Sequence, residues 1–286
     1  MILSEIGLRD PYIFADKASG WYYLYGSMKV RKEQTYFKVY KSRDLVEWDD
    51  GKVIFSAHDG FWGTTHFWAP ELHLVDGRYY LFATFAEADE RNRCQILTCD
   101  RPDGTFEVYE GPTTPEGWSA LDGTYYESDG KRYCIFCREW KDVINGEMCL
   151  MEMDEKLRPV GKVETLFAAR DAAWVVNASK TDECYVTDGP FIITCGKTFF
   201  MTWSSFSAEG YAVAYAKADD IHGPWIQQKE PLLNLDCGHG MIFEDFEGRY
   251  KLVCHCPNSV SEHPVIYDVT INEDEILVNL PQDSIS

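Results

Sequence analysis

Five copies of one short pattern recur along the chain, about 50 to 65 residues apart. Each copy has a polar or Pro-containing turn, a short apolar strand, a tight turn with Gly or Asp, and a second strand rich in aromatic residues. The copies begin at Asp10, Ala69, Asp122, Asp188 and His239. A repeat of this length holds about four strands with their loops, which is the size of one β-propeller blade. The sequence therefore predicts an all-β fold in which residues 1–286 form a single five-bladed β-propeller.

The turns inside these repeats carry the signals of β-hairpins. The Asp-Gly pairs at 76–77 and 129–130 each separate two apolar runs, and such a pair is a strong hairpin signal. Aromatic residues make up 15% of the chain and favour strands. A β-helix would need shorter repeats and a β-sandwich need not repeat at all, so neither explains the pattern.

The charge balance excludes several classes of partner. The chain carries 47 acidic and 27 basic residues, a formal net charge of −20. Nucleic acids and anionic membranes attract basic surfaces, so the sequence predicts no partner of either kind. The N-terminal segment lacks the pattern of a signal peptide, and the ten cysteines are scattered rather than arranged as in a small disulfide-rich domain. We therefore expect a cytoplasmic protein.

Acidic residues recur at the starts of the repeats. The innermost strand of each propeller blade lines the central channel, so equivalent ends of the five strands meet at one mouth. Asp10, Asp122 and Asp188 are therefore expected to face one another and to raise each other's pKa values. An Asp before Pro or Gly also caps turns, but three at matched positions indicate a site that needs an acid and a base. If the three charges repel, Asp10→Asn should leave thermal stability unchanged or raised.

The repeat starts also carry the motifs of a known family, in order along the chain. These motifs are Arg9-Asp10-Pro-Tyr-Ile, Phe67-Trp68-Ala-Pro-Glu71, Leu121-Asp122-Gly, Asp188-Gly-Pro-Phe-Ile and Gly238-His239-Gly. Together they resemble glycoside hydrolase family 43 over essentially the whole chain. The resemblance implies hydrolysis with inversion at the anomeric carbon, in which one carboxylic acid protonates the leaving oxygen and an opposite carboxylate activates water.

The resemblance also implies roles for the carboxylates. Asp10 corresponds to the general base, and Asp122 to the residue that tunes and orients the acid. Asp188 stands where the family has a Glu acid, and its side chain is one methylene shorter. Glu139 is a second candidate for the acid, because it ends the second strand of the third blade and a hairpin returns that end to the face of Asp122. The alternative for Glu139 is an exposed loop residue.

Further side chains are expected around these carboxylates. Phe67, Trp68, Glu71 and Trp140 are predicted to bind substrate, with Trp68 as a stacking wall for the sugar or, alternatively, as a residue that packs the blades. The resemblance implies that His239 lies in the channel and helps to hold a calcium ion or a water cluster; the alternative is a buried core histidine. No other cofactor is expected.

The function that the resemblance implies is hydrolysis of arabinose- or xylose-containing plant oligosaccharides. An exo-acting α-L-arabinofuranosidase or β-xylosidase is the first expectation. An endo-arabinanase is the alternative within the same chemistry, and it would need an open groove rather than a pocket. The missing Glu also raises a different alternative, a glycan-binding propeller without catalytic activity.

Overall fold

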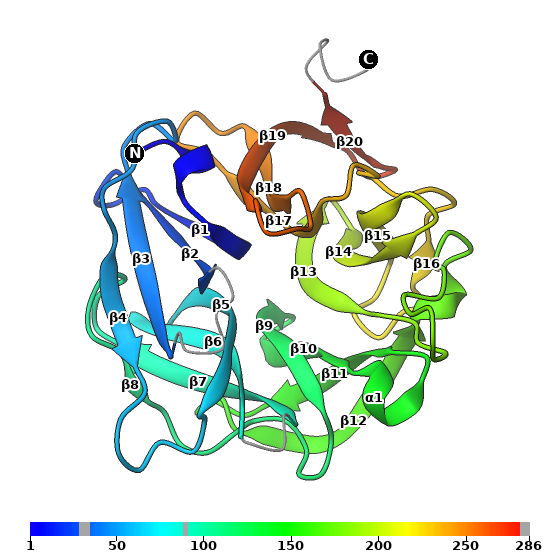
Figure 1. Cartoon of the computed structure of the whole chain (residues 1–286), viewed down its shortest axis with the longest axis horizontal. Helices are drawn as coiled ribbons and strands as arrows, with labels where there is room; N and C mark the ends of the chain where they lie inside the picture. Colours follow the sequence, from blue (N-terminus) through cyan, green and yellow to red (C-terminus); the bar gives the residue numbers. More distant parts are fainter. Residues whose placement is uncertain (29–34, 88–90, 281–286) are drawn as a thin grey trace.

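Twenty β-strands form five antiparallel four-stranded sheets in the computed structural model, which describes residues 1–28, 35–87 and 91–280. The sheets stand as blades around a central axis, and each contains four strands that are consecutive in the sequence (Figure 1). The predicted five-bladed β-propeller is therefore confirmed.

The strands of each blade are numbered outwards from the axis. The first blade contains β1 (Leu8–Asp16), β2 (Trp21–Met28), β3 (Tyr36–Ser42) and β4 (Lys52–Ser56). The second contains β5 (Thr65–Val75), β6 (Arg78–Ala86), β7 (Asn92–Cys99) and β8 (Glu107–Val108). The third contains β9 (Ala120–Ser128), β10 (Lys131–Arg138), β11 (Glu147–Met153) and β12 (Pro159–Ala168). The fourth contains β13 (Asp188–Cys195), β14 (Thr198–Ser207), β15 (Gly210–Ala218) and β16 (Ile226–Gln227). The fifth contains β17 (Gly238–Glu244), β18 (Tyr250–Cys256), β19 (His263–Ile271) and β20 (Ile276–Asn279). The helical segments are α1 (Trp140–Val143) and the 3₁₀ turns Leu3–Glu5 and Ala169–Asp171.

The inner strands form a closed ring. Each of β1, β5, β9 and β13 contacts the inner strand that follows it, and β17 contacts β1 again (Figure 1). The five predicted repeat starts all lie on these inner strands. Residues that are far apart in the sequence therefore meet around one channel.

Side chains of the first and fifth blades close the ring. The rings of Tyr22 and Phe246 stack with centroids 3.9 Å apart, and the Phe246 backbone N donates to the Tyr22 hydroxyl at 2.8 Å. At the inner end of the same junction, Arg9 Nη1 donates to Asn258 Oδ1 at 2.6 Å and to Glu262 Oε2 at 2.9 Å. Aromatic packing and charge-assisted hydrogen bonds thus join the two ends of the chain.

The core lies between the blades rather than at the axis. The middle strands β14 and β15 lie within the stack of blades, and most residues along them are buried. This explains why their sequences read as continuous apolar runs rather than as a strict alternation. Between the first two blades the contact is aromatic, with Phe37, Phe55, Phe67 and Phe85 in one buried cluster.

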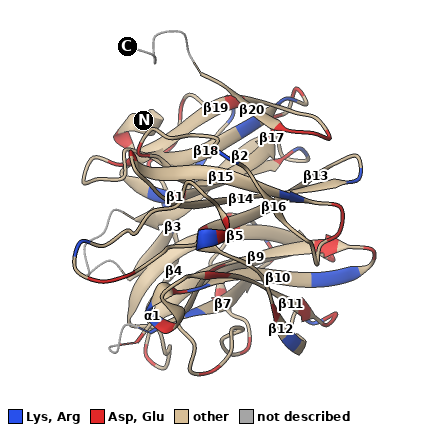
Figure 2. Ribbon diagram, turned by 90° about the vertical axis from the view of Figure 1, so that its right-hand side faces the viewer, with Lys and Arg blue, Asp and Glu red and all other residues tan. Residues whose placement is uncertain are grey.

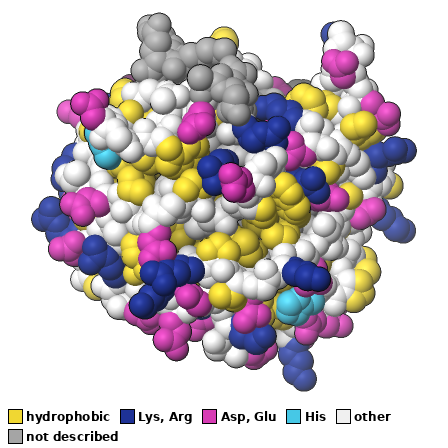
Figure 3. Space-filling view, turned by 90° about the horizontal axis from the view of Figure 1, so that it is seen from below, with side chains coloured by type: hydrophobic (Ala, Val, Ile, Leu, Met, Phe, Trp, Pro, Cys, Tyr) yellow, Lys and Arg dark blue, Asp and Glu magenta, His cyan; other side chains and the backbone are white. Residues whose placement is uncertain are grey.

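Charged residues lie mainly on the outside of the ring. Figure 2 shows acidic and basic residues interspersed over loops and strand ends. Figure 3 shows one face on which charged side chains of both signs surround hydrophobic patches. In the part of the chain that the structure describes, none of the helices has the length and apolar character needed to cross a membrane.

Every inner strand has a bulge at the same point. At this bulge the pairing register with the second strand of the blade shifts, and one residue has a positive φ. The five bulge residues are Asp10 (φ 49°), Ala69 (43°), Asp122 (55°), Gly189 (54°) and His239 (54°). Bulges re-aim side chains, and strained backbone of this kind is concentrated at functional sites.

A hydrogen bond from each bulge to a neighbouring element fixes its position. Four bulge N–H groups donate to a side chain on the second strand of the preceding blade. These bonds are Asp10 N to His255 Nδ1 (3.3 Å), Ala69 N to Ser27 Oγ (2.7 Å), Asp122 N to Thr84 Oγ1 (2.9 Å) and His239 N to Ser204 Oγ (2.8 Å). The Gly189 N–H instead donates to the Asp122 carboxylate, at 3.0 Å.

Candidate active site

The bulges gather charged side chains around a pocket of about 300 Å³ at the mouth of the channel. Each residue that lines it is a bulge residue or the residue directly before one. The lining residues are Arg9, Asp10, Trp68, Leu121, Asp122, Asp188 and His239. The repeat therefore converts five sequence-distant segments into one site, as the repeat starts predicted.

A larger hollow of about 620 Å³ lies at the outer junction of the first and fifth blades. Its buried carboxylate, Asp245, is paired locally, since Asp245 Oδ2 lies 2.8 Å from Arg249 Nη2 and 3.7 Å from Lys251 Nζ. The hollow contains none of the inner-strand carboxylates. We therefore place the chemistry in the smaller, central pocket.

Asp10 is surrounded by donors and positive charge. Ser27 Oγ donates to its Oδ2 at 2.6 Å, and its Oδ1 lies 3.3 Å from His239 Nδ1 and 3.5 Å from Arg9 Nε. Burial alone would raise the pKa of Asp10, but the charges of His239 and Arg9 outweigh it and hold that pKa well below its usual range. Asp10 is therefore an ionised carboxylate at neutral pH, as a general base must be.

The pKa of Asp188 is shifted in the opposite direction, upwards. Its side chain is half-buried at the pocket, and Tyr211 donates a 2.7 Å hydrogen bond to Oδ2. Removal of the carboxylate from bulk water raises the pKa of Asp188 to about 6, although the Tyr211 hydrogen bond opposes this shift. A carboxyl group with this pKa holds a proton in a useful fraction of molecules near neutral pH, as a general acid must.

Asp122 links the third blade to the fourth. Its Oδ2 accepts the hydrogen bond from Gly189, the residue directly after Asp188, and lies 3.7 Å from His239 Nδ1. Burial and the neighbouring charges of Asp188 and Asp10 raise the pKa of Asp122 well above its usual range. The predicted mutual rise in pKa is thus found for Asp122 and Asp188 but is wrong for Asp10.

The bulge geometry also corrects the predicted equivalence of the three aspartates. Asp10 and Asp122 are bulge residues, whereas Asp188 lies one position earlier, directly before the bulge at Gly189. Asp188 therefore enters the pocket from a different strand position than the other two. The sequence pattern Asp-Gly-Pro conceals this offset, because Gly189 rather than Asp188 aligns with Asp10.

His239 lies between the carboxylates at the channel centre, and Glu71 lies beyond it. His239 Nε2 is 4.0 Å from Glu71 Oε1, and Glu71 Oε2 is 3.5 Å from His73 Nε2. Burial opposes protonation of His239, but Asp10 and Asp122 raise its pKa to about 10. Glu71 is buried and does not line the pocket. It was predicted to bind substrate, and the structure instead places it behind His239.

Two polar atoms in the channel suggest what His239 could hold. His239 Nε2 and Glu71 Oε2 are buried, and neither has a hydrogen-bond partner among the described residues. Calcium takes six to eight oxygen ligands, and here one carboxylate and one imidazole are available. The pair fits an ion with a shell made mostly of water, or a water cluster, rather than an ion enclosed by protein.

Trp68 forms one wall of the pocket, whereas its neighbour Phe67 does not. Phe67 is buried in the aromatic cluster with Phe37, Phe55 and Phe85. Successive side chains of a strand point to opposite faces, so only one of two adjacent aromatic residues can reach the pocket. The prediction that Phe67 binds substrate is corrected: it packs the first blade against the second.

Glu139 and Trp140 also lie outside the pocket lining. Glu139 follows β10 and is buried, and its Oε2 accepts hydrogen bonds from Asn92 Nδ2 at 2.9 Å and from Ser119 Oγ. Trp140 begins α1 and is half-exposed. Glu139 is therefore neither an exposed loop residue nor placed as a general acid, and the prediction of Trp140 as a substrate contact is not supported by its position.

Sequence reasoning missed Tyr211 and Arg9 as site residues. Arg9 was part of the quoted motif, but nothing in the sequence showed its contact with Asp10. Tyr211 lies near the start of β15, the third strand of the fourth blade. Its ring reaches Asp188 because Gly238, on β17 of the next blade, has no side chain in the way. A Cβ atom at Gly238 would lie 1.6 Å from the Tyr211 ring. This glycine before His239 is the one sequence signal for the approach of a bulky ring.

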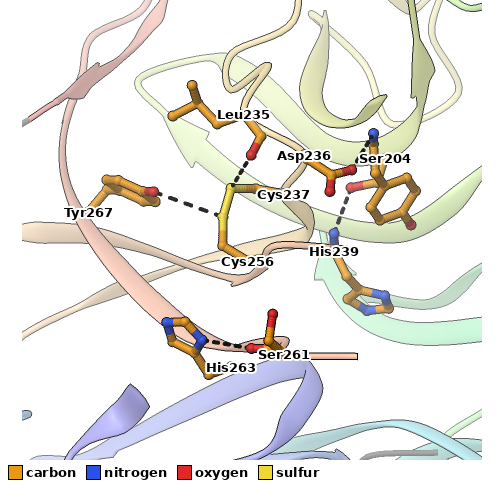
Figure 4. Close-up of a disulfide and its surroundings, with 10 residues drawn as sticks. Ser204, Leu235, Asp236, Cys237, His239, Cys256, Ser261, His263 and Tyr267 are labelled. Carbon is orange, nitrogen blue, oxygen red and sulfur yellow. Dashed lines mark hydrogen bonds between the residues drawn. A yellow bond between two sulfur atoms is a disulfide. The ribbon is translucent and has the colours of Figure 1, made fainter. Parts of the chain in front are cut away.

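A disulfide joins the two segments of the fifth blade that approach Asp10. It connects Cys237, directly before β17, to Cys256 at the end of β18, two residues from His239 and one from His255 (Figure 4). The other eight cysteines are free. The predicted cytoplasmic location stays a prediction: free thiols fit a reducing compartment, whereas a disulfide persists in an oxidising one.

Comparisons with known proteins agree with the family that the sequence motifs resemble. The profile of Glycosyl hydrolases family 43 matches residues 4–277. A solved endo-arabinase from Bacteroides thetaiotaomicron superposes with a TM-score of 0.89 at 38% identity, over 96% of this chain and 98% of that chain. Alpha-L-arabinofuranosidase 43 of Humicola insolens is 24% identical over 241 residues, which is 78% of this chain and 47% of that protein.

A further relative is an extracellular exo-alpha-(1->5)-L-arabinofuranosidase of Streptomyces chartreusis. It is 26% identical over 190 residues, which is 63% of this chain and 56% of that protein. The chain thus spans about half the length of these two curated relatives. The profile match covers all five inner strands, from the Asp10 bulge to the His239 bulge. With the propeller and its ring of inner-strand carboxylates, this match shows that the chain belongs to glycosyl hydrolases family 43.

Proposed function

We propose that the chain is an inverting, exo-acting glycosidase that removes terminal α-L-arabinofuranosyl or β-D-xylosyl residues from plant oligosaccharides. The observation that carries the proposal is the opposite behaviour of two carboxylates in one pocket. Asp10 is held ionised, whereas the pKa of Asp188 is raised to about 6. Two titratable groups whose pKa values are pushed apart are the signature of an acid and base pair.

The chemistry assigned to this pair is a single displacement. Asp188 donates its proton to the glycosidic oxygen as the bond from that oxygen to the anomeric carbon breaks. Asp10 accepts a proton from the water that attacks the same carbon from the opposite face, so the configuration inverts. Asp122 holds the backbone next to Asp188, and Trp68 packs against the apolar C–H face of the sugar.

Pocket size supports exo action. A volume of about 300 Å³ is at the small end of ligand sites, and this suits one terminal sugar rather than the middle of a chain. Two relatives of the chain carry exo or arabinofuranosidase activity in their names. The positive Arg9 and His239 are paired with acidic groups, so the pocket suits an uncharged sugar.

An endo-arabinanase is the second candidate, and one observation favours it. The solved structure with 38% identity over 96% of this chain is named an endo-arabinase. The two activities differ in their products. On debranched arabinan an exo-acting enzyme releases monosaccharide with a slow fall in viscosity, whereas an endo-acting enzyme releases oligosaccharides with a fast fall.

Hydrolysis assays test the proposed function. Nitrophenyl α-L-arabinofuranoside, nitrophenyl β-D-xyloside and debranched arabinan are each incubated with the wild type and with Asp10→Asn. Turnover of one of the nitrophenyl glycosides by the wild type alone supports the proposal. Oligosaccharide products from arabinan would favour the endo activity. If no glycoside is cleaved but sugars bind, the non-catalytic glycan-binding alternative holds instead.

We also propose that Glu71 and His239 Nε2 hold a hydrated cation, calcium being the expected ion. Binding would displace the Nε2 proton and leave a neutral imidazole whose Nδ1–H faces Asp10. When bound, the ion would add positive charge beneath Asp10 and Asp122. Metal analysis after exhaustive chelation and calcium repletion, together with the melting temperature of each form, tests this. One equivalent of calcium with a raised melting temperature supports the proposal, and an unchanged protein with no bound metal favours the water cluster.

A further inference from the structure

A chain of contacts runs from the buried Glu139 and Asn92 through the half-buried His66 to the wall of the pocket. Glu139 Oε2 accepts a hydrogen bond from Asn92 Nδ2 at 2.9 Å, and Asn92 Oδ1 lies 2.6 Å from His66 Nδ1. The ring of His66 stacks on that of Trp68, with centroids 3.8 Å apart and an interplanar angle of 13°. Trp68 lines the pocket. Glu139 is thus connected to the pocket without touching it.

The hydrogen bond at Glu139 determines how the next two polar groups of this chain of contacts, Asn92 and His66, must be oriented. Asn92 Nδ2 and Ser119 Oγ both donate to Glu139 Oε2, so the Asn92 amide is held with its NH₂ group towards Glu139. Its carbonyl oxygen then faces His66, which can complete the bond only with a proton on Nδ1. Glu139 therefore selects one amide orientation of Asn92 and one tautomer of His66.

Burial makes this selection strict. Asn92 has no exposed surface, and Glu139 and Ser119 are 6% and 2% exposed. Ser119 Oγ donates to Glu139 Oε2, and the Asn92 backbone N donates to Ser119 Oγ at 3.2 Å. Water is thus largely excluded as a substitute partner for Glu139 and Asn92, although His66 itself is half-buried, and a buried polar group that loses its partner is costly.

The backbone at His66 is shaped for this contact. His66 has φ of 55°, a left-handed conformation that a non-glycine residue adopts only when its surroundings hold it. The β5–β6 register shifts between Thr65 and Trp68, in addition to the bulge at Ala69. This extra irregularity brings the His66 ring over one face of Trp68, which leaves the rest of the indole for the pocket.

We propose that Glu139 is a positioning residue for the sugar site, acting through Asn92 and His66 to hold Trp68 in place. The proposal rests on the proposed glycosidase function. The ligand that it serves is the apolar C–H face of a neutral pentose, which packs on the face of an aromatic ring. Glu139, Asn92 and His66 touch neither the sugar nor the reacting atoms.

The test compares two substitutions of Glu139. Glu139→Ala removes the acceptor, and we expect a KM about tenfold higher with kcat changed less than about threefold, the pattern of lost ground-state binding. Glu139→Gln keeps an oxygen acceptor for Asn92 and Ser119 and should restore a near wild-type KM. Nitrogen-15 NMR of histidine-labelled protein should show the Nδ1–H tautomer of His66 in the wild type and in Glu139→Gln, and its loss in Glu139→Ala.

Two controls separate positioning from general destabilisation. Asp245→Ala removes an equally buried carboxylate of the fifth blade and should lower the melting temperature without changing KM. His66→Ala should raise KM as Glu139→Ala does, and the double variant should be no worse than either single variant, because both act through one chain of contacts. His66→Ala also gives a result if Glu139→Ala does not fold.

The outcomes distinguish this inference from the proposed function. If the wild type is active and Glu139→Ala or His66→Ala keeps a wild-type KM, the positioning role is wrong. If the effects of the two variants on KM are additive, they do not act through one chain. A wild type that neither cleaves nor binds any glycoside would instead refute the glycosidase function, and the positioning role with it.

Discussion

The backbone N–H of Gly189 donates a 3.0 Å hydrogen bond to Oδ2 of Asp122. In the other four blades the corresponding bulge N–H is bound by a side chain from the second strand of the preceding blade. In the third blade the equivalent residue of the second strand is Cys137. It lies opposite Leu121 in the strand pairing, just as Ser27 lies opposite Arg9 in the first blade. The Asp122 carboxylate takes over the structural bond and thereby fixes the segment that carries Asp188.

Two substitutions separate the structural and electrostatic roles of Asp122. Asp122→Ala leaves the buried Gly189 N–H without an acceptor, so we expect a loss of about 1–3 kcal/mol in the free energy of unfolding and a fall in kcat of about 10²-fold. Asp122→Asn keeps an oxygen acceptor and should lose activity with little loss of stability. Urea unfolding and steady-state kinetics measure the two effects. Equal stability losses in both variants would argue against this bond as the anchor.

Asp10→Asn should lower the rate of hydrolysis by about 10²–10⁴-fold or more, because the general base is lost. It should also lower the free energy of unfolding. This reverses the expectation from charge repulsion alone, because His239 and Arg9 stabilise the ionised carboxylate. The pKa of Asp10 in the folded protein lies below its unfolded value of about 3.9. Ionised Asp10 therefore stabilises the protein above that pH, and the contribution is lost as the pH falls towards the lower, folded pKa.

Melting temperatures of the wild type and Asp10→Asn between pH 7 and pH 3 measure this contribution. The difference should be largest at pH 7 and should shrink as the pH falls below about 4. A variant as stable as the wild type at pH 7 would show that repulsion from Asp122 and Asp188 dominates instead.

The pH dependence of kcat/KM should report the acid. The pKa of Asp188 is raised to about 6, and only the protonated form donates a proton, so the rate should fall as the pH rises through that value. Tyr211 donates to the carboxylate and lowers this pKa. In Tyr211→Phe the alkaline limb should therefore move to higher pH. A limb that stays in place or moves to lower pH would contradict the assigned role of Tyr211.

The disulfide between Cys237 and Cys256 should be reducible with a measurable effect on stability. It closes a loop with a sequence separation of 19 residues, and cross-links of this size stabilise proteins by about 2–4 kcal/mol. We expect dithiothreitol to lower the melting temperature of the wild type but not of Cys237→Ser. Cys195→Ser, which alters a half-exposed free cysteine, is the matched control. Alkylation under denaturing, non-reducing conditions that finds ten free thiols would contradict the pairing.

The sequence predicted the fold well because the signals of a propeller are local. Each blade consists of consecutive hairpins, so turns such as Asp129-Gly130 define the pairing partners without long-range information. Because each repeat starts with the inner strand of a blade, the same local pattern also predicted that Asp10 and Asp122 lie at the mouth of the channel. The hairpin also brings Glu139 back beside the start of β9, where its backbone N–H donates to Ser119 O, but the sequence did not show that its side chain is buried outside the pocket.

Side-chain environments depend on register and on contacts between blades, which the sequence pattern does not carry. Phe67 and Trp68 are adjacent and both aromatic, and only the shifted pairing of β5 decides which one faces the pocket. One hydrogen-bond partner of Glu139 is Asn92, 47 positions earlier in the chain. The low pKa of Asp10 likewise depends on His239 at the far end of the chain, which repulsion among aspartates alone could not reveal.

The central claim is that Asp188, although shorter than the Glu of its family, is the general acid. An acid matters in proportion to how poor the leaving group is, so its loss should slow natural glycosides far more than activated aryl glycosides. The direct measurement is the ratio of rates on a natural oligosaccharide and on the dinitrophenyl glycoside, in Asp188→Asn and in Glu139→Gln. We predict a selective loss on the natural substrate in Asp188→Asn and a wild-type ratio in Glu139→Gln. A selective loss confined to Glu139→Gln would contradict the account and place the acid in the third blade.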